Sequence, residues 1–228
     1  MIPLRDDTPT VIKPVVTISI IAACTLAFLW QISHGDRGQQ LIAYALGLVP
    51  AVLLAGKQLP PQLALVPPAA TVVTSMFLHG SWMHLIGNML YLWIFGNNVE
   101  EAMGHVRFIV FYLLCGVAAA MAQSLPDPES TIPMIGASGA LSGVLGAYLM
   151  LHPHARVLVA IPLGFYVHLT YLPALWMLGI WFLLQLASSL VVSSKEGGVA
   201  WYAHIGGFVA GLLLVPLFKR RGVPLFSS

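Results

Sequence analysis

The feature that most constrains this chain is the near absence of charge over long stretches. Only 8% of its 228 residues are Asp, Glu, Lys or Arg, whereas 58% are hydrophobic, and the mean hydropathy is +0.87. Soluble domains are about one-quarter charged, so this composition requires a lipid bilayer as solvent. A helix that crosses the hydrocarbon core needs about 20 apolar residues. Six such runs are present, at 14–33, 79–97, 106–124, 137–153, 171–192 and 200–218.

These runs predict an all-α membrane protein, with residues 1–228 forming a single bundle of six transmembrane helices and a long first outer loop at 34–78. The loop contains an apolar piece, LIAYALGLVPAVLLAG, which Pro50 interrupts and which is too short to span. We expect this piece to lie in the membrane interface or to pack against the bundle. The first run is interpreted as a retained span because no small-x-small cleavage site follows it.

The distribution of Lys and Arg predicts that both termini are cytoplasmic. With the N-terminus inside, the inner segments hold seven basic residues and the outer segments three. The inner residues are Arg5, Lys13, Arg107, Arg156, Lys219, Arg220 and Arg221, and the outer ones are Arg37, Lys57 and Lys195. Cytoplasmic loops are enriched in Lys and Arg. Because no further domain or targeting segment is evident, we expect the plasma membrane of a bacterium or an archaeon. The net charge of +2 and the scattered basic residues predict no nucleic-acid binding.

Polar side chains interrupt three of the apolar runs. The second run opens with HGSWMHLIGNM, which contains His79, His84 and Asn88, the fourth contains Ser138, and the sixth contains His204. Spans two, four and six run in the same direction, so these groups are expected roughly 5–12 Å below the outer surface, at 1.5 Å per residue. His84 and Asn88 are four residues apart and share a helical face. His79 is expected at the rim or just outside the helix. Polar groups in spans usually face the bundle interior and mark a site.

These residue types fit nucleophilic catalysis. A serine hydroxyl becomes a nucleophile when a neutral histidine removes its proton, which assigns these roles to Ser138 and His204. The oxyanion of a tetrahedral intermediate needs donors, and the free N–H groups at a helix start, His84 and Asn88 supply them. All eight acidic residues are expected in termini or loops, with Glu100 in a solvated inner loop. With no carboxylate in a span to orient the histidine, the residues permit a Ser–His dyad rather than a triad.

Glycine spacing places the same helices side by side. Gly139 and Gly143 are four residues apart on the fourth run, as Gly207 and Gly211 are on the sixth. Small residues at this spacing let helix backbones approach closely in membranes. If these two faces meet, the serine and the histidine come within reach of each other.

Other interpretations of the same residues stay open at this point. Ser138 and its glycines could serve helix packing alone. His204 could be a hydrogen-bonded interior histidine, and His79, His84 and His204 together could ligate zinc in a metal or transport site. That alternative leaves Asn88 and the G-x-S-G sequence unexplained. The joint occurrence of these groups on three parallel helices at one depth favours catalysis.

The chain resembles the rhomboid family of intramembrane serine proteases over nearly its whole length. The G-x-S-G motif is Gly136-Ala137-Ser138-Gly139, which places the family's catalytic serine on Ser138. The A-H-x-x-G-x-x-x-G motif contains Ala203, His204, Gly207 and Gly211 and places the catalytic histidine on His204. His79, His84 and Asn88 match the second-span motif, in which the last two resemble oxyanion-hole donors. Glu100 and Gly104 match an acidic–glycine pattern of the inner loop.

The resemblance implies six spans, a water-filled site open to the outside, and no metal or cofactor. It implies cleavage of single-span membrane proteins near their outer membrane boundary, so the expected partners are transmembrane substrates and lipid. It also implies that the fifth span and the outer loop near 193–199 gate substrate entry, while a non-catalytic binding protein is the alternative within the family. Two departures are present: 34–78 lacks the Trp-Arg pair of many relatives, and Ser142 stands where some relatives have an aromatic residue.

Overall fold

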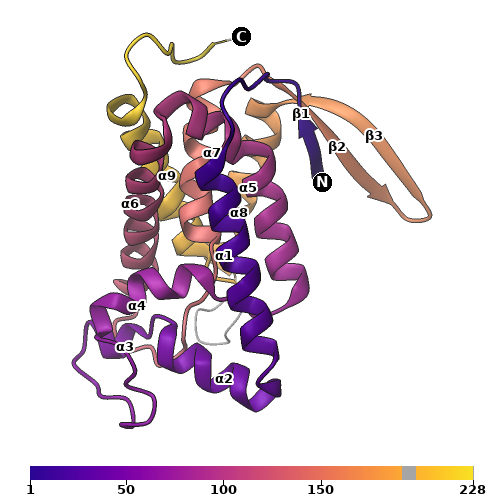
Figure 1. Cartoon of the computed structure of the whole chain (residues 1–228). Coiled ribbons are helices and arrows are strands. Elements are labelled where there is room, and N and C mark those ends of the chain that lie inside the picture. Colours follow the sequence, from indigo (N-terminus) through magenta and orange to yellow (C-terminus); the bar gives the residue numbers. More distant parts are fainter. Residues whose placement is uncertain (192–198, 228) are drawn as a thin grey trace.

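All six predicted spans are helices, and they pack side by side in one bundle (Figure 1). The structure is a computed structural model that describes residues 1–191 and 199–227. The six helices are α1 (Val15–Ile32), α5 (Trp82–Met103), α6 (His105–Ser124), α7 (Ser138–Leu151), α8 (Ala174–Val191) and α9 (Trp201–Phe218). The gating loop expected near 193–199 falls almost entirely outside the described residues.

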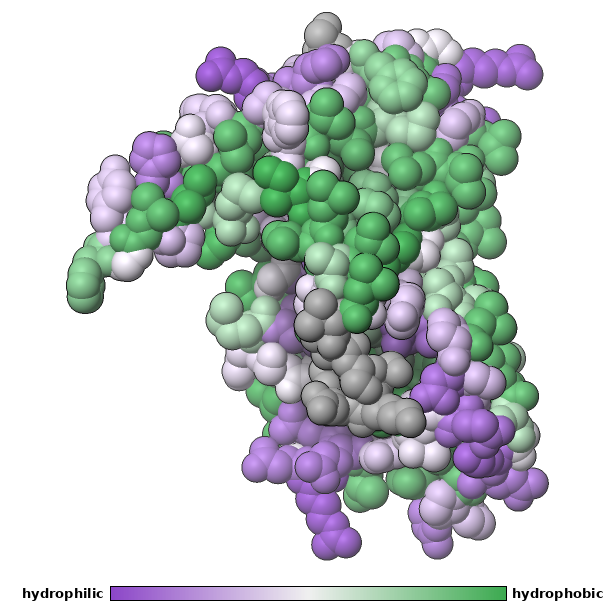
Figure 2. All heavy atoms as spheres, turned by 180° about the vertical axis from the view of Figure 1, so that it is seen from behind, coloured by the Kyte–Doolittle hydropathy of each residue, from purple (hydrophilic) through white to green (hydrophobic). Residues whose placement is uncertain are grey.

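The surface of the bundle has the distribution of polarity that a membrane demands. Figure 2 shows apolar side chains over the sides of the helices and hydrophilic side chains gathered toward the two ends. Helices α1, α6 and α9 are long and apolar enough to cross a membrane by length and composition. The chain is therefore a mostly helical membrane protein.

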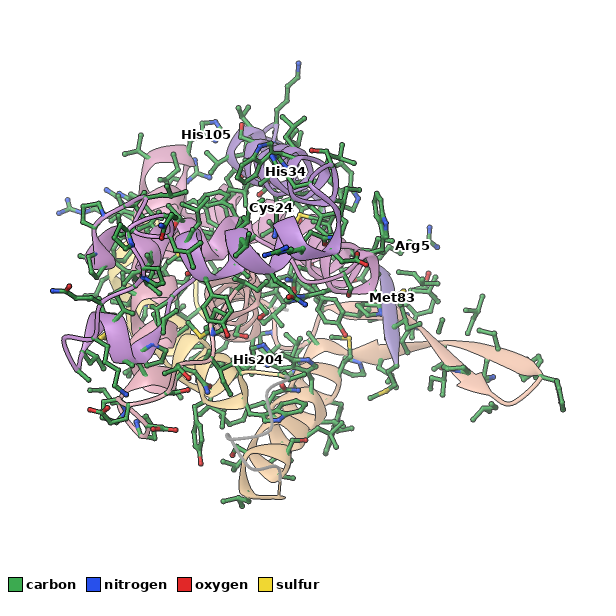
Figure 3. All side chains as sticks on the ribbon, turned by 90° about the horizontal axis from the view of Figure 1, so that it is seen from below. Arg5, Cys24, His34, Met83, His105 and His204 are labelled. Atoms are coloured by element: carbon green, nitrogen blue, oxygen red, sulfur yellow. The ribbon has the colours of Figure 1, made fainter. Side chains whose placement is uncertain are left out.

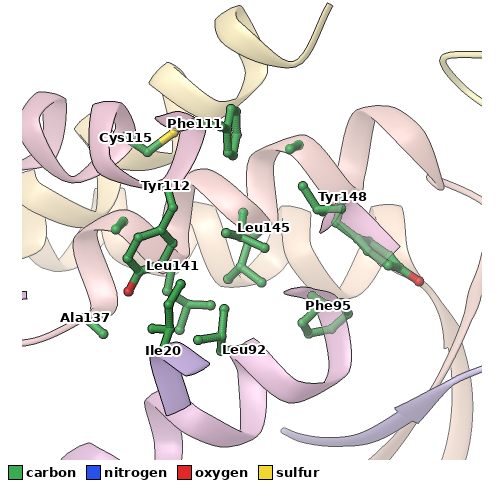
Figure 4. Close-up of a cluster of buried hydrophobic side chains, with 14 of the residues drawn as sticks. Ile20, Leu92, Phe95, Phe111, Tyr112, Cys115, Ala137, Leu141, Leu145 and Tyr148 are labelled. Carbon is green, nitrogen blue, oxygen red and sulfur yellow. The ribbon is translucent and has the colours of Figure 1, made fainter. Parts of the chain in front are cut away.

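The centre of the bundle is α7, which is buried along most of its length. Figure 4 shows Leu141, Leu145 and Tyr148 of this helix facing Leu92 and Phe95 of α5, with side chains of α1 and α6 completing the cluster. Lipid is as apolar as these side chains, so close packing and dispersion, rather than exclusion from water, hold the helices together. Tight packing at α7 fixes the position of the residues at its N-terminus.

The segment 34–78, predicted to be the first outer loop, packs onto the bundle, which is one of the two arrangements expected for its apolar piece. It contains α2 (Gly35–Leu46), α3 (Pro50–Leu53), α4 (Pro68–Thr74) and the 3-10 helix η1 (Ser75–Phe77). Pro50 begins α3, so the proline divides the apolar piece as predicted. Leu48 is fully buried and exchanges two backbone hydrogen bonds with Met134, of 3.0 and 2.7 Å. The loop thereby supports the segment that leads into α7.

The predicted all-α bundle is present, but the prediction missed three strands that form an antiparallel sheet in the order β1-β2-β3. These are β1 (Ile2–Asp6), β2 (Arg156–Leu163) and β3 (Tyr166–Pro173). The fifth span was predicted from residue 171, but its helix begins at Ala174 because the preceding residues pair with β2. Val, Ile and Tyr favour strands, and Gly164 at φ +65° allows the tight turn between them. Figure 1 shows this hairpin projecting sideways from the bundle.

The N-terminal strand is attached to the bundle through Asp6. The hydroxyl of Tyr148 donates a 2.6 Å hydrogen bond to the Asp6 carboxylate, and the amide of Asn98 donates to the same oxygen. Burial raises the pKa of the Asp6 carboxyl above its ordinary value. Both chain termini lie at this end of the bundle (Figure 1), as expected for an even number of spans.

The expectation of a solvated loop at Glu100 was also wrong. Glu100 lies in α5 and is fully buried. Its carboxylate accepts hydrogen bonds from Val16 N at 2.9 Å, Thr17 N at 2.8 Å and Thr17 Oγ1 at 2.7 Å. A carboxylate at a helix N-terminus satisfies free N–H groups and interacts favourably with the helix dipole. Gly104, at φ +80°, then turns the chain from α5 into α6. The acidic–glycine pattern is thus a junction that fastens α1.

We expect Glu100→Gln to destabilise the protein, because the glutamine NH₂ group faces the donors of α1. Hydrogen bonds to a charged group contribute about 1.5–3 kcal/mol each. A net loss of about 2 kcal/mol lowers Tm by roughly 4–8 °C in a chain of this size. Thermal unfolding in detergent measures the change. Glu101→Gln is the matched control, since Glu101 accepts one exposed bond from Val11 N and should change Tm little. Equal Tm values for both variants would contradict the capping role.

Candidate functional site

Helices α7 and α9 meet at their glycines, as their spacing predicted. A Cβ atom at Gly207 would overlap the backbone carbonyl of Gly139, and one at Gly211 would overlap that of Gly143. Farther along, Gly146 packs against the backbone of Phe208. The order of these contacts shows that the two helices are parallel. Their N-termini therefore lie at one level, with the backbones in direct contact.

This contact brings the predicted serine and histidine together. Ser138 is the first residue of α7, and His204 lies in the first turn of α9. Ser138 Oγ is 2.8 Å from His204 Nε2, a hydrogen-bond distance. His204 is buried, with a relative exposure of 9%. Figure 3 shows His204 inside the outline of the bundle. A neutral imidazole at this distance can take the hydroxyl proton.

Asn88 faces the same space from α5, and its partner corrects the expectation for His79. His79 was expected at the rim of the helix or just outside it. It lies just before α5, but it is fully buried rather than at an exposed rim. Asn88 Nδ2 donates to His79 Nε2 at 3.0 Å. This bond uses one of the two amide hydrogens of Asn88, fixes the orientation of its side chain, and leaves the second hydrogen free for a ligand.

His84 approaches the serine beside Gly136. A Cβ atom at Gly136 would lie 2.7 Å from His84 Nε2 and 3.7 Å from Ser138 Oγ, so both atoms border the space that the missing side chain leaves. Gly136 adopts φ +130°, a conformation that favours glycine. On the other side of the ring, Gly80 N–H points to His84 Nδ1 at 3.5 Å. With Nδ1 as an acceptor, Nε2 carries the hydrogen and presents a donor toward the serine.

A cavity of about 650 Å³ opens onto these groups. Its lining includes Ser138, His204, His84 and Asn88, together with the loop before α7. Cavities of roughly 300–1,000 Å³ are typical of ligand sites. The serine therefore lies at the wall of a cavity large enough to hold a ligand.

Gln185 is a residue at the site that the sequence interpretation missed. It lies on α8, is buried, and its Oε1 is 2.7 Å from His204 Nδ1. Only carboxylates were considered as partners for the histidine, although a polar side chain within a span is itself a signal. Among the described residues, no carboxylate bonds to His204: Glu129, for example, pairs with Lys57 at 2.7 Å.

The departure at Ser142 has a structural outcome. Ser142 Oγ donates to Ser138 O at 2.7 Å, within its own helix. Aromatic rings reach His204 from other elements instead. The ring centroids of Trp181 on α8 and Trp201 at the start of α9 lie 6.0 and 6.2 Å from that of His204.

The described residues do not assemble the histidines into a metal site. His79 and His84 have ring centroids 5.1 Å apart, whereas both ring nitrogens of His204 face other partners, Ser138 and Gln185. Across residues 1–191 and 199–227, no group of three or more His, Cys, Asp or Glu side chains has a geometry that could hold a metal ion. Cys24 and Cys115 are both buried and unpaired with each other.

Comparisons with known proteins identify the family to which the chain is similar. The family described as "Rhomboid domain" matches residues 68–221, more than half of the chain. "Rhomboid protein 1, mitochondrial" of Saccharomyces cerevisiae is 32% identical over 152 residues, which cover 63% of this chain and 40% of the yeast protein. "Rhomboid-like protein 11, chloroplastic" of Arabidopsis thaliana is 30% identical over 156 residues, covering 65% and 52% of the two chains. "Rhomboid protease GluP" of Bacillus subtilis is 40% identical over 78 residues, covering 34% and 15%.

The relatives come from several different membranes, which matters for the expected location of this chain. They include mitochondrial, chloroplastic and bacterial proteins, so the comparisons do not bear out the expectation of a bacterial or archaeal plasma membrane. The chain spans about two fifths of the yeast relative and about half of the Arabidopsis one.

The contact between α7 and α9 predicts a specific sensitivity to an added methyl group. Gly207→Ala should lower Tm, because the new Cβ meets the Gly139 backbone, which cannot move aside, and such overpacking costs about 1–3 kcal/mol. Gly179→Ala on α8 is the matched control, since no atom lies within 4 Å of its added Cβ. Thermal unfolding of both variants in detergent checks this. A Gly207→Ala protein as stable as Gly179→Ala would show that the backbones are not in contact.

Proposed function

The chain belongs to the rhomboid family, and from this premise we propose that it is an intramembrane serine endopeptidase with Ser138 as nucleophile and His204 as general base. One observation carries the proposal: the 2.8 Å contact between Ser138 Oγ and His204 Nε2 at the wall of a cavity of about 650 Å³. An interior histidine that served packing alone would have no need of a serine partner open to solvent.

The proposed reaction begins when the substrate carbonyl carbon enters beside Ser138. His204 Nε2 takes the hydroxyl proton while Oγ bonds to that carbon, and the carbonyl π pair moves onto oxygen. Collapse of the tetrahedral intermediate breaks the C–N bond, and His204 gives its proton to the leaving amine. A water molecule, deprotonated by His204, then attacks the ester, and Ser138 recovers its proton as the acid product leaves.

The negative oxygen needs donors close to Ser138. His84 Nε2–H borders the gap at Gly136, and Asn88 retains an amide hydrogen beyond the one bonded to His79. The N–H groups at the start of α7 have no intrahelical acceptor and supply a further donor. A single donor to an oxyanion lowers the activation free energy by about 2.7–4 kcal/mol. We therefore assign His84 and Asn88 to the oxyanion hole, with His79, Gly136, Gly139, Gly207 and Gly211 as supporting residues.

The remaining parts of the proposal concern the membrane. The six helices are proposed to be six spans, with both termini on the cytoplasmic side, since the end that holds the termini also holds Lys219, Arg220 and Arg221. The site then lies toward the outer face. The proposed substrates are single-span membrane proteins, cut near the outer boundary of their span. Residues 1–228 are proposed to act as one domain without a metal or cofactor.

Cleavage of a single-span fusion protein in reconstituted vesicles tests this function. We expect the wild-type protein to cut the fusion within or beside its span, and Ser138→Ala and His204→Ala each to reduce turnover by at least about 10³-fold. Ser142→Ala is the matched control, since it removes a serine from the same helix that bonds only to its own backbone. Mass spectrometry of the fragments gives the cut position.

Two results would contradict the proposal. One is turnover by Ser138→Ala that equals that of Ser142→Ala. The other is a folded wild-type protein that binds single-span proteins without cutting any of them, which would favour a non-catalytic binding role. Loss of activity on adding a chelator would instead support the metal-site alternative.

A further inference from the structure

The far side of the catalytic histidine is occupied by an amide. Gln185 lies on α8, a helix that contributes neither the serine nor a proposed oxyanion donor. Its side chain has a relative exposure of 7%, and its Oε1 is 2.7 Å from His204 Nδ1. The contact joins α8 to α9 and lies on the ring nitrogen opposite the one that faces Ser138.

A second hydrogen bond determines which way the amide points. Gln185 Nε2 donates to the carbonyl oxygen of Trp181 at 3.3 Å, one helical turn back. If the amide were rotated by 180°, its oxygen would face that carbonyl oxygen, and two acceptors would oppose each other. The bond to Trp181 therefore fixes Oε1 toward His204.

The direction of the amide determines the tautomer of the histidine. A carboxamide oxygen only accepts hydrogen bonds, so His204 Nδ1 must carry a hydrogen. In the neutral ring Nε2 then has its lone pair free, and Nε2 is the atom 2.8 Å from Ser138 Oγ. The other tautomer would place a hydrogen on Nε2 and could not accept the serine proton. In catalytic triads a carboxylate performs this task.

An amide suits this position better than a carboxylate. The site lies among apolar helices, where an ionised side chain is costly, whereas a neutral amide with both polar atoms bonded is tolerated. The rings of Trp181 and Trp201 lie near the imidazole, with centroids 6.0 and 6.2 Å from its own. Gln185 can thus set the tautomer and the ring orientation without bringing a charge into the membrane.

We propose that Gln185 is the positioning residue of His204: through its Oε1 it holds the proton on Nδ1 and keeps Nε2 free to act as base. This inference rests on the proposed function. It replaces a dyad by a linear chain of hydrogen bonds from Trp181 O through Gln185 and His204 to Ser138, with a neutral third member.

Phosphonylation of Ser138 by a fluorophosphonate probe tests the role without a known substrate. Gln185→Met keeps the length of the side chain but loses the acceptor, and Gln185→Glu keeps an acceptor oxygen and adds a charge. Leu186→Met, at an exposed neighbour on α8, is the control. The rate constant of labelling is measured in vesicles as a function of probe concentration and pH, with thermal unfolding recorded for each variant.

We expect Gln185→Met to lower the maximal labelling rate by at least about tenfold, within the 10²–10⁴-fold that a general base contributes, while the probe concentration at half-maximal rate stays within about twofold. Gln185→Glu should label faster than Gln185→Met. Its acidic limb in the pH–rate profile should move to higher pH, because a carboxylate at Nδ1 stabilises the charged imidazolium. A merely structural role would not move this limb.

Labelling of Gln185→Met at the rate of Leu186→Met would overturn the role of Gln185, as would a Gln185→Glu profile whose acidic limb is unmoved. If Gln185→Met fails to fold, the Gln185→Glu profile still decides between these outcomes. Failure of the proposed function looks different: the wild-type protein is not labelled, or Ser138→Ala still is, and the positioning role falls with it.

A separate observation concerns the hairpin of β2 and β3, which the catalytic site does not use. Its outer half exposes five large side chains, Leu163, Phe165, Tyr166, Val167 and Leu169, each with a relative exposure above 50%. Residues 157–173 contain no Asp, Glu, Lys or Arg, and Arg156 stands at the base. Paired residues near the tip, such as Pro162 with Val167 and Leu163 with Tyr166, place apolar side chains on both faces, beside the exposed His168.

The direction of the hairpin places these side chains beside the membrane. It leaves the bundle sideways at the end where α7 finishes and α8 begins, which is also the end that holds both termini (Figures 1 and 3). Lipid surrounds the sides of a transmembrane bundle, so an arm that projects sideways at this level meets the bilayer boundary. In the described sheet β3 is an edge strand with unpaired backbone groups, which hydrocarbon does not tolerate and headgroups and water satisfy.

We infer that the hairpin is an interfacial anchor that inserts its tip among the lipid headgroups of the leaflet next to the termini. The amphipathic rings of Tyr166 and Tyr171 suit this depth, where Tyr and Trp concentrate, and Phe165 adds an apolar ring at the tip. At the base, the Arg156 guanidinium lies 5.1 Å from the centre of the Tyr171 ring, a position from which a cation can also attract anionic headgroups. The anchor would fix the start of α8, to which β3 is directly joined.

Site-specific fluorescence in vesicles of phosphatidylcholine and phosphatidylglycerol tests the anchor. Phe165→Cys is labelled with an environment-sensitive dye, and Val11→Cys is the control, because Val11 is at the same end, is also highly exposed and lies outside the hairpin. We expect at least twofold quenching of the Phe165→Cys dye by headgroup-attached nitroxide lipid and little by aqueous iodide, with the reverse for Val11→Cys. Iodide quenching equal at both positions would overturn the anchor. Self-quenching at Phe165→Cys that grows with protein density would overturn it too, in favour of contact with a second copy.

Discussion

The backbone contact between α7 and α9 is the interaction on which the rest of the structure depends. Without side chains at Gly139, Gly143, Gly207 and Gly211, the two helices touch along their main chains. Because the helices are parallel, the contact also aligns their N-termini, and so a serine at the start of one and a histidine in the first turn of the other are 2.8 Å apart. Dispersion between closely packed backbones, which lipid cannot replace, stabilises this arrangement.

The surrounding elements restrict what the pair can do. Leu48 and Met134 hold the strand-like segment before α7, and the positive φ of Gly136 lets His84 approach the serine. His79 turns Asn88 toward the same space from outside α5. Glu100 fastens the start of α1 at the opposite end of α5. Each of these groups acts on the position of a neighbour, so the site is defined by polar contacts that the apolar helices enclose.

The sequence allowed the helices and the central pair to be predicted because their signals are local and repetitive. Long apolar runs predicted the helix ends to within three residues, except that α5 continues six residues beyond the predicted end at 97, to Met103. Glycine spacing predicted the contact of α7 with α9. The hairpin was missed because VLVAIPL and YVHLTYLP are apolar, and hydropathy counts them as part of a loop or span without distinguishing strand from helix. Glu100 was misplaced because an acidic residue in an apolar chain suggests a loop, whereas its charge is satisfied by a helix N-terminus 84 residues away in sequence.

The role of Gln185 and the burial of His79 could be recognised only from the three-dimensional structure. The amide of Gln185 bonds to His204, 19 residues along the chain on another helix, and its orientation is fixed by Trp181 on its own helix. A glutamine within a span signals a polar contact, but the local sequence does not show that its oxygen meets a histidine of another helix. The aromatic rings near His204 likewise come from α8 and from the start of α9. A serine at position 142 therefore does not leave the histidine without aromatic neighbours.

The measurement that tests the central claim most directly is the site of covalent modification by a fluorophosphonate in the membrane-embedded protein. Digestion and mass spectrometry after labelling should place one phosphonyl group on Ser138, and His204→Ala protein, still folded by thermal unfolding, should carry none. A wild-type protein that remains unmodified, or an adduct on another residue that persists in Ser138→Ala, would contradict the account of Ser138 as a nucleophile activated by His204.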